Sequence, residues 1–207
     1  MKEAEFDLLG LEATEKILFQ ETFDKLNASF DLHIESNYKF NFKNFSIFNE
    51  YEDYYTRDAF KIVQANSYSH VTFTEVSYSF AGGRSGEISG REIQVWGIVN
   101  LNFDYGKILV QPETLFLKIQ ELMNPIEIDF EEDKKFSKRY YLLASDKEKA
   151  RRFFKPEVRK IFLELSGNDY FIEINNNVLI IGNKKRVHPL HGLEIANFVS
   201  HLTSINL

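Results

Sequence analysis

Two long aromatic-rich segments, residues 71–80 and 91–103, flank a glycine-rich stretch at 81–90, and this arrangement restricts the fold more than any other feature of the chain. Both segments are filled with Phe, Tyr, Trp and Val, the residues that favour β-strands. The glycines between them suit the turn of a hairpin, because glycine adopts backbone angles that other residues avoid. We therefore predict a long β-hairpin at the centre of an antiparallel sheet.

The apolar residues of the first arm change face along its length. Val71 and Phe73 fall on one face of the predicted strand, whereas Val76 falls on the other. A β-bulge around Thr74 and Glu75 would reconcile the two halves, since one extra residue switches the face to which the following side chains point. The sequence thus predicts a bulge at this position.

The second arm carries apolar residues on both faces. A strand of this kind lies inside a sheet, with both of its faces covered. The residues concerned are Ile93, Val95, Val99, Leu101 and Phe103 on one face and Trp96 and Ile98 on the other.

Hydrophobic periodicity places the other elements of the first two thirds of the chain. Residues 8–28 predict an amphipathic helix that has Ile17 and Phe19 in its apolar stripe and Glu15 on its polar face. The remaining elements predicted there are extended structure at 30–44, strands at 45–51, 60–64, 107–111 and 126–130, a polar break at 53–58 and a helix at 112–123.

Residues 137–203 predict the order β-α-β-β-α. After a strand at 137–143, Ser145 and Glu148 have the spacing of a capping box at the start of a helix. Pro156 should divide this helix, because proline has no N–H to donate to the preceding turn. A hairpin that turns at the asparagines 175–177 and a helix at 189–203 complete the order.

These elements together indicate an α+β fold. A mainly antiparallel, β-rich N-terminal half precedes the β-α-β-β-α unit, with helices packed on the sheet. A chain of 207 residues is long enough to bury a core as a single unit over residues 1–207. A subdivision into a β-rich part with the N-terminal helix, 1–111, and an α+β part, 112–207, remains the alternative.

The composition limits the classes of function. The chain has no Cys, which excludes disulfides, thiolate metal sites and thiol catalysis and fits a reducing compartment. A formal net charge of −6 argues against nucleic-acid binding through phosphate contacts. Neither a secretory signal nor a transmembrane segment is recognised. We therefore expect a cytoplasmic protein and interpret the basic clusters at 149–152 and 184–186 as solvated faces.

The glycine-rich stretch 81–90 is the first candidate for a functional site. Its backbone and Arg84 could hold an anion, but the spacing of its glycines matches neither a dinucleotide-binding fingerprint nor a P-loop. It also joins two strands instead of leading into a helix. We interpret it as a hairpin tip, and leave open a hydrolase or small-ligand site that would use Arg84 and Glu87.

Histidines and carboxylates supply two weaker candidates. His188 and His191 could share a face at the start of the last helix, but His201 would lie about 15 Å further along the axis, too far to share a metal ion. The densest carboxylates are Glu127, Asp129, Glu131, Glu132 and Asp133, which we interpret as a solvated edge, with an oxygen-ligand cation site as the alternative. We therefore assign no catalytic, cofactor-binding or metal-binding residue, and no cofactor.

From residue 45 onward the chain resembles a broad family of uncharacterised bacterial proteins. The segments that carry the resemblance are 109–113, 126–130, 136–140, 146–154 with Arg152, Glu173 and 178–181. Members of this family often have transmembrane helices ahead of the region, so the resemblance implies a cytoplasmic domain held near a membrane. It supplies no catalytic residues and favours a function without catalysis.

The sequence thus leads to three hypotheses of function. The first is a cytoplasmic binding module whose partner is another protein, a second copy of the chain or a membrane-associated complex. The second is the hydrolase or small-ligand enzyme with its site at 81–90. The third is peripheral membrane contact through the amphipathic helix at 8–28.

Overall fold

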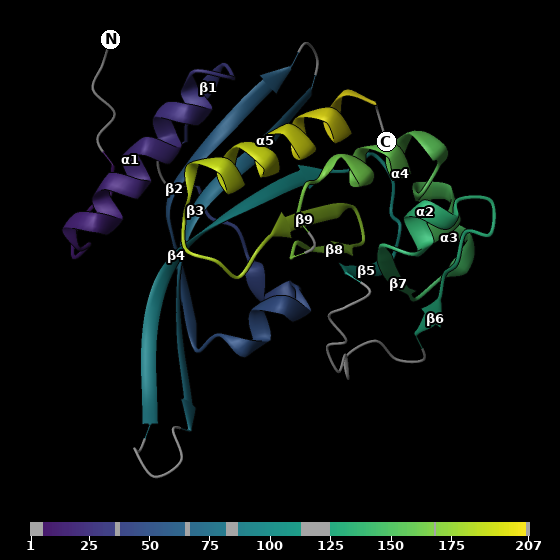
Figure 1. Ribbon diagram of the computed structural model, residues 1–207, viewed down its shortest axis with the longest axis horizontal. Helices are drawn as coiled ribbons and strands as arrows, with labels where there is room; N and C mark the ends of the chain where they lie inside the picture. Colours follow the sequence, from purple (N-terminus) through teal and green to yellow (C-terminus); the bar gives the residue numbers. More distant parts are fainter. Residues whose placement is uncertain are drawn as a thin grey trace.

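The computed structural model describes residues 6–35, 38–64, 67–81, 87–112, 125–167 and 169–205, without the side chains of residues 80, 81, 87, 88 and 112. Nine strands in this part of the chain form one sheet in which all neighbours are antiparallel, with the order β1-β2-β3-β4-β9-β8-β5-β7-β6 (Figure 1). Helices pack on this sheet, so the predicted α+β class is confirmed.

The elements have the following bounds. The strands are β1 Leu32–Ile34, β2 Asp53–Gln64, β3 Ser67–Ala81, β4 Glu87–Asn100, β5 Lys107–Pro112, β6 Ile126–Glu127, β7 Tyr140–Ala144, β8 Phe171–Asn175 and β9 Val178–Gly182. The helices are α1 Ala13–Asn27, α2 Lys134–Ser137, α3 Lys147–Phe153, α4 Pro156–Glu164 and α5 Pro189–Ser204, with two 3-10 helices, η1 Phe42–Asn44 and η2 Ser46–Glu50.

The predicted central hairpin is confirmed as β3 and β4. The two strands pair from His70 opposite Ile98 to Ala81 opposite Glu87 without a break in register. Both faces of β4 are covered as predicted, except that the strand ends at Asn100 and Phe103 beyond it is 55% exposed. The far ends of the hairpin extend past the rest of the molecule in Figure 1.

The bulge predicted in the first arm was assigned to the wrong strand. The irregularity lies in β2, between Thr56 and Asp58, so that Arg57 is the extra residue. β3 pairs with β4 in regular register, and its apolar residues lie on both faces because both faces are buried: Phe73 contacts the helical layer and Val76 the opposite layer. Two-sided burial produces the pattern that looked like a bulge.

The helical side of the sheet holds the larger core. α1 and α5 contact each other and cover β3 and β4. α4 contacts α5 and extends the layer to β7, where the Tyr140 hydroxyl donates to the carbonyl of Phe162. Gly97 makes the close approach of α5 possible, because a Cβ atom there would lie 2.5 Å from Val199 Cγ1 and 2.8 Å from Ile195 Cγ2. α5 therefore sits almost directly on the backbone of β4.

The opposite side of the sheet carries an aromatic layer built from η1 and η2. Phe42, Phe45 and Phe48 recur every three residues, which matches the three-residue turn of a 3-10 helix, and all three are buried. The strand predicted at 45–51 was therefore wrong. Glu173 of β8 anchors the layer by accepting the backbone N–H groups of Ser46 (3.0 Å) and Ile47 (3.3 Å).

The polar break predicted at 53–58 was also wrong, because these residues form the first half of β2. β2 lies next to the sheet edge, where polar and charged side chains reach solvent without a penalty for burial. The alternation that marks a buried strand is therefore weak here.

The predicted β-α-β-β-α order of the C-terminal part is confirmed, with α3 and α4 separated at Pro156 and with Asn176 at a φ of 58° in the turn. The cap of α3 is Asp146, which accepts the N–H of Glu148, whereas Ser145 accepts the N–H of Lys107. The predicted capping box of Ser145 and Glu148 was therefore wrong, because Asp146 is the N-cap residue. The helix predicted at 112–123 lies outside the described residues.

α1 begins at Ala13, later than the predicted helix, and its faces differ from the prediction at two positions. Ile17 is 56% exposed, whereas Glu15 is buried and accepts the N–H of Glu12 at the start of the helix (2.9 Å). Phe19 and Leu26 face the core as predicted. The apolar face of α1 is therefore used in packing on the sheet and on α5.

Gly97→Ala tests the close contact between α5 and β4. The added methyl group has no room, so we expect the free energy of unfolding to fall by about 1–3 kcal/mol. Urea denaturation measures this change. Gly90→Ala on the same strand is the matched control, because its Cβ meets the partly exposed ring of Tyr78, which can turn toward solvent. An equal loss in both variants would contradict the packing argument.

Candidate functional site

A groove opens beside β2 where the chain leaves the edge of the sheet. β1 pairs with β2 only from Phe60 to Ile62, and the last contact is the Glu35 N–H to the carbonyl of Ala59 (2.9 Å). Beyond it the chain diverges from β2 and leaves a cavity of about 510 Å³. The lining residues are Asp7, Glu35, Tyr38, Lys39, Phe40, Tyr54, Tyr55, Thr56, Arg57, Asp58 and Ala59.

One wall of this groove, called the β2 groove below, is the rim of the aromatic layer. Tyr38, Phe40 and Tyr54 pack against the core on that side of the sheet. The Tyr38 ring lies 4.4 Å from the ring of His70, and the Tyr54 hydroxyl accepts the N–H of Lys43 (3.2 Å). These contacts hold the rings in place.

The bulge of β2 builds the other wall. Tyr55 and Asp58 lie opposite Glu75 and Phe73 of β3, so both point to the helical side of the sheet, where the segment before α1 crosses. The Asp7 N–H donates to Asp58 Oδ2 (3.2 Å). The bulge thus brings an N-terminal residue and a strand carboxylate together at one place.

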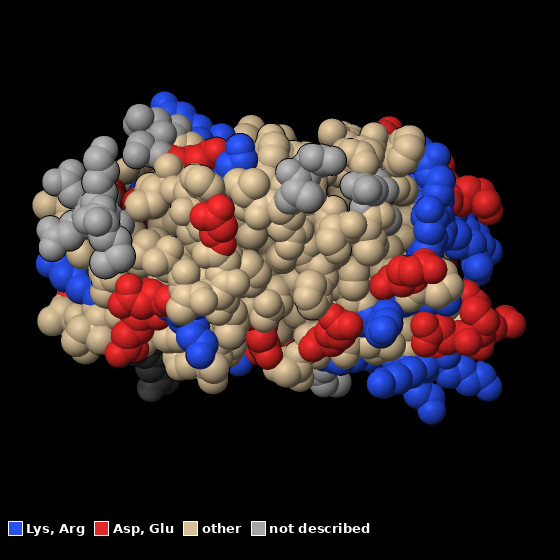
Figure 2. Space-filling model, turned by 90° about the horizontal axis from the view of Figure 1, so that it is seen from above, with Lys and Arg blue, Asp and Glu red and all other residues tan. Residues whose placement is uncertain are grey.

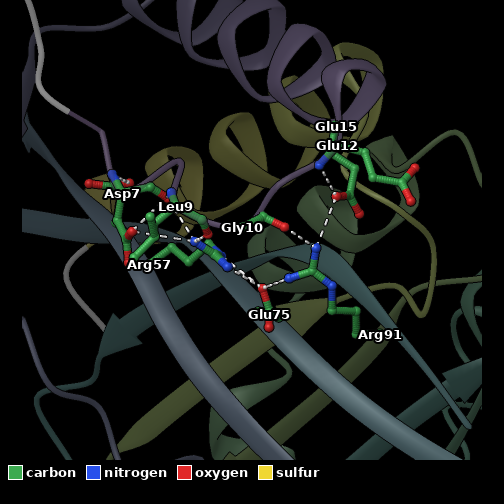
Figure 3. Close-up of polar contacts among 9 residues, drawn as sticks. Asp7, Leu9, Gly10, Glu12, Glu15, Arg57, Glu75 and Arg91 are labelled. Carbon is green, nitrogen blue, oxygen red and sulfur yellow. Dashed lines mark hydrogen bonds and ion pairs between the residues drawn. The ribbon is translucent and has the colours of Figure 1, made fainter.

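Arg57 fixes this wall through its guanidinium, and its side chain is only 7% exposed (Figure 3). Its Nε donates to Glu75 Oε2 (2.8 Å), and its Nη1 donates to the carbonyls of Asp7 (2.9 Å) and Leu9 (3.0 Å). The Asp7 carboxylate is 3.4 Å from the same nitrogen. One side chain therefore joins the N-terminal segment to both β2 and β3.

Arg91 of β4 extends the network to the start of α1. Its Nη1 is 3.1 Å from Glu75 Oε2, and its Nη2 donates to the carbonyl of Gly10 and lies 3.5 Å from Glu15 Oε2 (Figure 3). Glu75 is shared by the two arginines. Because the residues of this network come from β2, β3, β4, the segment before α1 and α1 itself, the network sets the position of the groove wall relative to the sheet.

Burial raises the pKa of Asp58 to about 6, and the nearby Asp7 carboxylate adds to the shift, while the Asp7 N–H and Arg57 oppose it. The hydrogen bond with Asp7 raises the pKa of Tyr55. Burial likewise raises the pKa of Tyr38 and lowers that of His70, whose Nε2 is 3.0 Å from Glu35 Oε2. The groove thus contains a carboxyl group that titrates near neutral pH.

Most of the first candidate site lies outside the described residues. Arg84 and Ser85 lie outside the described residues, and Glu87 is described only by its backbone, which pairs with Ala81. Ser89 is exposed on β4 opposite Ser79. The hydrolase or small-ligand site at 81–90 stays a prediction.

Of the three candidate histidines, His188 and His191 lie close together and His201 does not join them. The rings of His188 and His191 are 5.3 Å apart, and His188 Nδ1 accepts the N–H of Leu190 as the cap of α5. Burial and Lys185 lower the pKa of His191. His201 pairs instead with Glu164 (3.1 Å). In the described ranges no group of three or more His, Asp or Glu is arranged to hold a metal ion.

The acidic cluster is solvated at one end and structural at the other. Glu127, Asp129 and Glu131 are exposed, as predicted. Asp133 instead caps α2 through the N–H of Phe136 and pairs with the buried Arg159 (2.9 Å). Its role is therefore to hold α2 against α4.

Three lysines of the basic clusters pair with acids of other segments. Lys149 contacts Asp104, Lys184 contacts Glu50 and Lys185 contacts Asp169. Figure 2 shows, on the face seen from above, that charged side chains of both signs lie mainly toward the ends, whereas the middle carries few charges. α5, which crosses the upper part of Figure 1, contains a single charged residue, Glu194.

Sequence reasoning missed the groove and the residues behind it. Arg57, Glu75 and Arg91 were not singled out, and Tyr54 and Tyr55 were assigned to a polar break. One signal was present: Glu75 follows Val71 and Phe73 on the same strand face, and a charge in an apolar face needs a partner. The identity of that partner depends on strand pairing, which the sequence does not show.

Together, the fold and the groove define an α+β protein in which helices cover one face of a nine-stranded antiparallel sheet and a polar and aromatic groove opens beside its edge. No protein-family model and no curated protein matches the chain. Among solved structures, the fold is similar to that of the mycobacterial trehalose monomycolate transport factor A, TtfA. The TM-score is 0.56 over 91% of this chain and 93% of the other, with 6% sequence identity, so the likeness concerns the fold.

None of the helices in the described residues is long and apolar enough to cross a bilayer.

Arg57→Ala tests the buried part of the network. The substitution leaves the carbonyls of Asp7 and Leu9 without this donor and leaves Glu75 with Arg91 alone, so we expect the free energy of unfolding to fall by about 2–4 kcal/mol. Amide hydrogen exchange should accelerate at residues 7–10. Arg91→Ala is the control: its guanidinium is 37% exposed, and we expect a loss of about 1 kcal/mol or less. If urea denaturation gives the same loss of unfolding free energy for both variants, burial does not make Arg57 more important for stability than Arg91.

Asp58→Asn tests the raised pKa. The pKa of Asp58 is about 6 in the folded state and 3.8 ordinarily, so protonation of Asp58 stabilises the folded state. This contribution to the free energy of unfolding is complete below about pH 4 and is lost as the pH rises through 6. The amide still accepts the Asp7 N–H, so we expect the variant to be more stable than the wild type at pH 7, by about 1–2 kcal/mol.

Urea denaturation across this pH range measures the effect. Asp53→Asn, which changes an exposed carboxyl at the start of the same strand, provides the control. If the two variants have the same pH dependence as the wild type, Asp58 has an ordinary pKa.

Proposed function

We propose that this protein is a binding module that acts by holding a ligand in the β2 groove and catalyses no reaction. The groove itself carries the proposal. Its volume of about 510 Å³ lies within the range of small-molecule sites, about 300–1,000 Å³. Its lining combines the aromatic rings of Tyr38, Phe40, Tyr54 and Tyr55 with charged and polar side chains, and polar groups in such a site fix the orientation of a ligand.

The network behind the groove supports the same function. Arg57 and Glu75 tie the wall to β3, and Arg91 ties it to α1. A wall held in this way before the ligand arrives loses little conformational entropy on binding, which favours affinity.

The fold supports a role in transport. The solved structure with a similar fold is named as a transport factor. We extend this to the present chain: the protein would be a cytoplasmic accessory factor that binds a cargo or a component of a membrane-associated complex. The absence of Cys from the chain fits that location.

Protein-observed NMR with a library of small fragments tests the proposal. We expect the fragment hits to shift the backbone resonances of Tyr54 to Ala59, with dissociation constants of about 1 mM. Lys39→Trp, on the exposed wall of the groove, should alter or abolish these shifts. Lys138→Trp, an exposed lysine outside the groove, should leave them unchanged. If the hits cluster elsewhere, or if there are none, the β2 groove is not a ligand-binding site.

A further inference from the structure

We infer that the ligand of the β2 groove is a neutral, polyhydroxylated molecule of about the size of a disaccharide, either a free saccharide or the sugar headgroup of a glycolipid. This inference rests on the proposed function, since it names the chemical class that the same groove would take. Four features of the groove support it.

The first feature is the mixture of hydrogen-bonding groups. Asp7, Glu35 and Asp58 supply carboxylate acceptors, and Lys39 and Thr56 supply donors. Asp58 accepts the Asp7 N–H, and an ionised carboxylate has about four lone-pair sites, so further acceptor capacity remains. A hydroxyl group both donates and accepts, so neighbouring hydroxyls on one ligand can use both kinds of group.

The second feature is the placement of the aromatic rings. Tyr38 and Tyr54 form a fixed wall on one side, and Tyr55, which is 55% exposed, stands on the other side of the strand. A sugar ring has an apolar face made of C–H groups, and such a face packs favourably on an aromatic ring. The groove thus offers apolar surfaces next to hydrogen-bonding groups, which matches the two kinds of surface of a pyranose.

The third feature is the charge. Three carboxylates face the groove, against Lys39 and the Arg57 guanidinium, and Arg57 is already engaged with Glu75 and two backbone carbonyls. An anion would be repelled by the carboxylates. A cation would compete with Lys39 and with the internal pair that Arg57 makes with Asp7. A neutral ligand avoids both penalties.

The fourth feature is the bulge, which argues against an extended peptide. A peptide that adds to a sheet edge needs a regular row of backbone donors and acceptors. The extra residue at Arg57 breaks this row in the middle of the groove, and bulges are one of the devices by which edge strands resist pairing with another chain. The groove therefore suits a compact ligand better than a strand.

The test titrates the full chain with trehalose, maltose and cellobiose and follows binding by NMR. We expect at least one disaccharide to shift the resonances of Tyr55, Thr56 and Asp58 with a dissociation constant of about 1 mM. In a parallel arm, co-sedimentation with phosphatidylcholine vesicles that contain a diglycosyl lipid is compared with vesicles of phosphatidylcholine alone. Binding of the free sugars identifies a saccharide, and binding only to the glycolipid vesicles identifies a headgroup.

Two variants make the test specific. Tyr55→Ala and Asp58→Ala should each weaken binding by about tenfold. Tyr68→Ala removes a comparably exposed tyrosine, 44% exposed on β3 and outside the groove, and should have no effect. Because the Tyr55 side chain is largely exposed, its variant should stay folded even if Asp58→Ala does not.

The inference is overturned if none of the sugars and no glycolipid vesicle binds, or if Tyr55→Ala binds as tightly as the wild type. If fragments still map to the groove in that case, the binding function stands and only the ligand class is wrong. If an extended peptide is the compound that binds there, the bulge does not protect the edge and the inference also fails.

Discussion

Burial of both faces of the β3–β4 hairpin is the constraint on which the rest of the structure depends. Phe73 and Val95 need a helical layer on one side, and Val76 and Trp96 need an aromatic layer on the other. Segments that precede and follow the hairpin in the chain therefore converge on it from both sides. α5, the last helix of the chain, reaches the backbone of β4 because Gly97 has no side chain.

The groove follows from the way in which the sheet ends. β2 is the outer neighbour of the hairpin, and β1 covers only part of its length. The bulge at Arg57 turns one cation inward, where Glu75 receives it, and this pair in turn holds the segment before α1. An ion pair between two adjacent strands thus sets the geometry of a surface site. Burial of Asp58 in this site raises its pKa, although Arg57 opposes the shift.

Elements with a regular pattern of buried residues were predictable from the sequence, and the strands near the edge of the sheet were not. The two-sided pattern of β4, the break at Pro156 and the turn at Asn176 all depend on residues close in sequence, so the hairpins and C-terminal helices were predicted correctly. The prediction for the first half of β2 was wrong, because its Asp53, Arg57 and Asp58 resemble a loop when the position of the sheet edge is unknown. In β3, apolar residues on both faces were mistaken for a bulge, because the sequence does not show which faces are covered.

The sequence by itself determined the α+β class, the central hairpin and the alternation of elements in the C-terminal part, since each arises from local periodicity and from the backbone limits of glycine and proline. Only the tertiary structure decided the position of the bulge, the pairing of Glu75 with both Arg57 and Arg91, and the existence of the β2 groove. These features join residues more than eighty positions apart, from Asp7 to Arg91. Their contacts arise from strand order and register, which are properties of the assembled sheet.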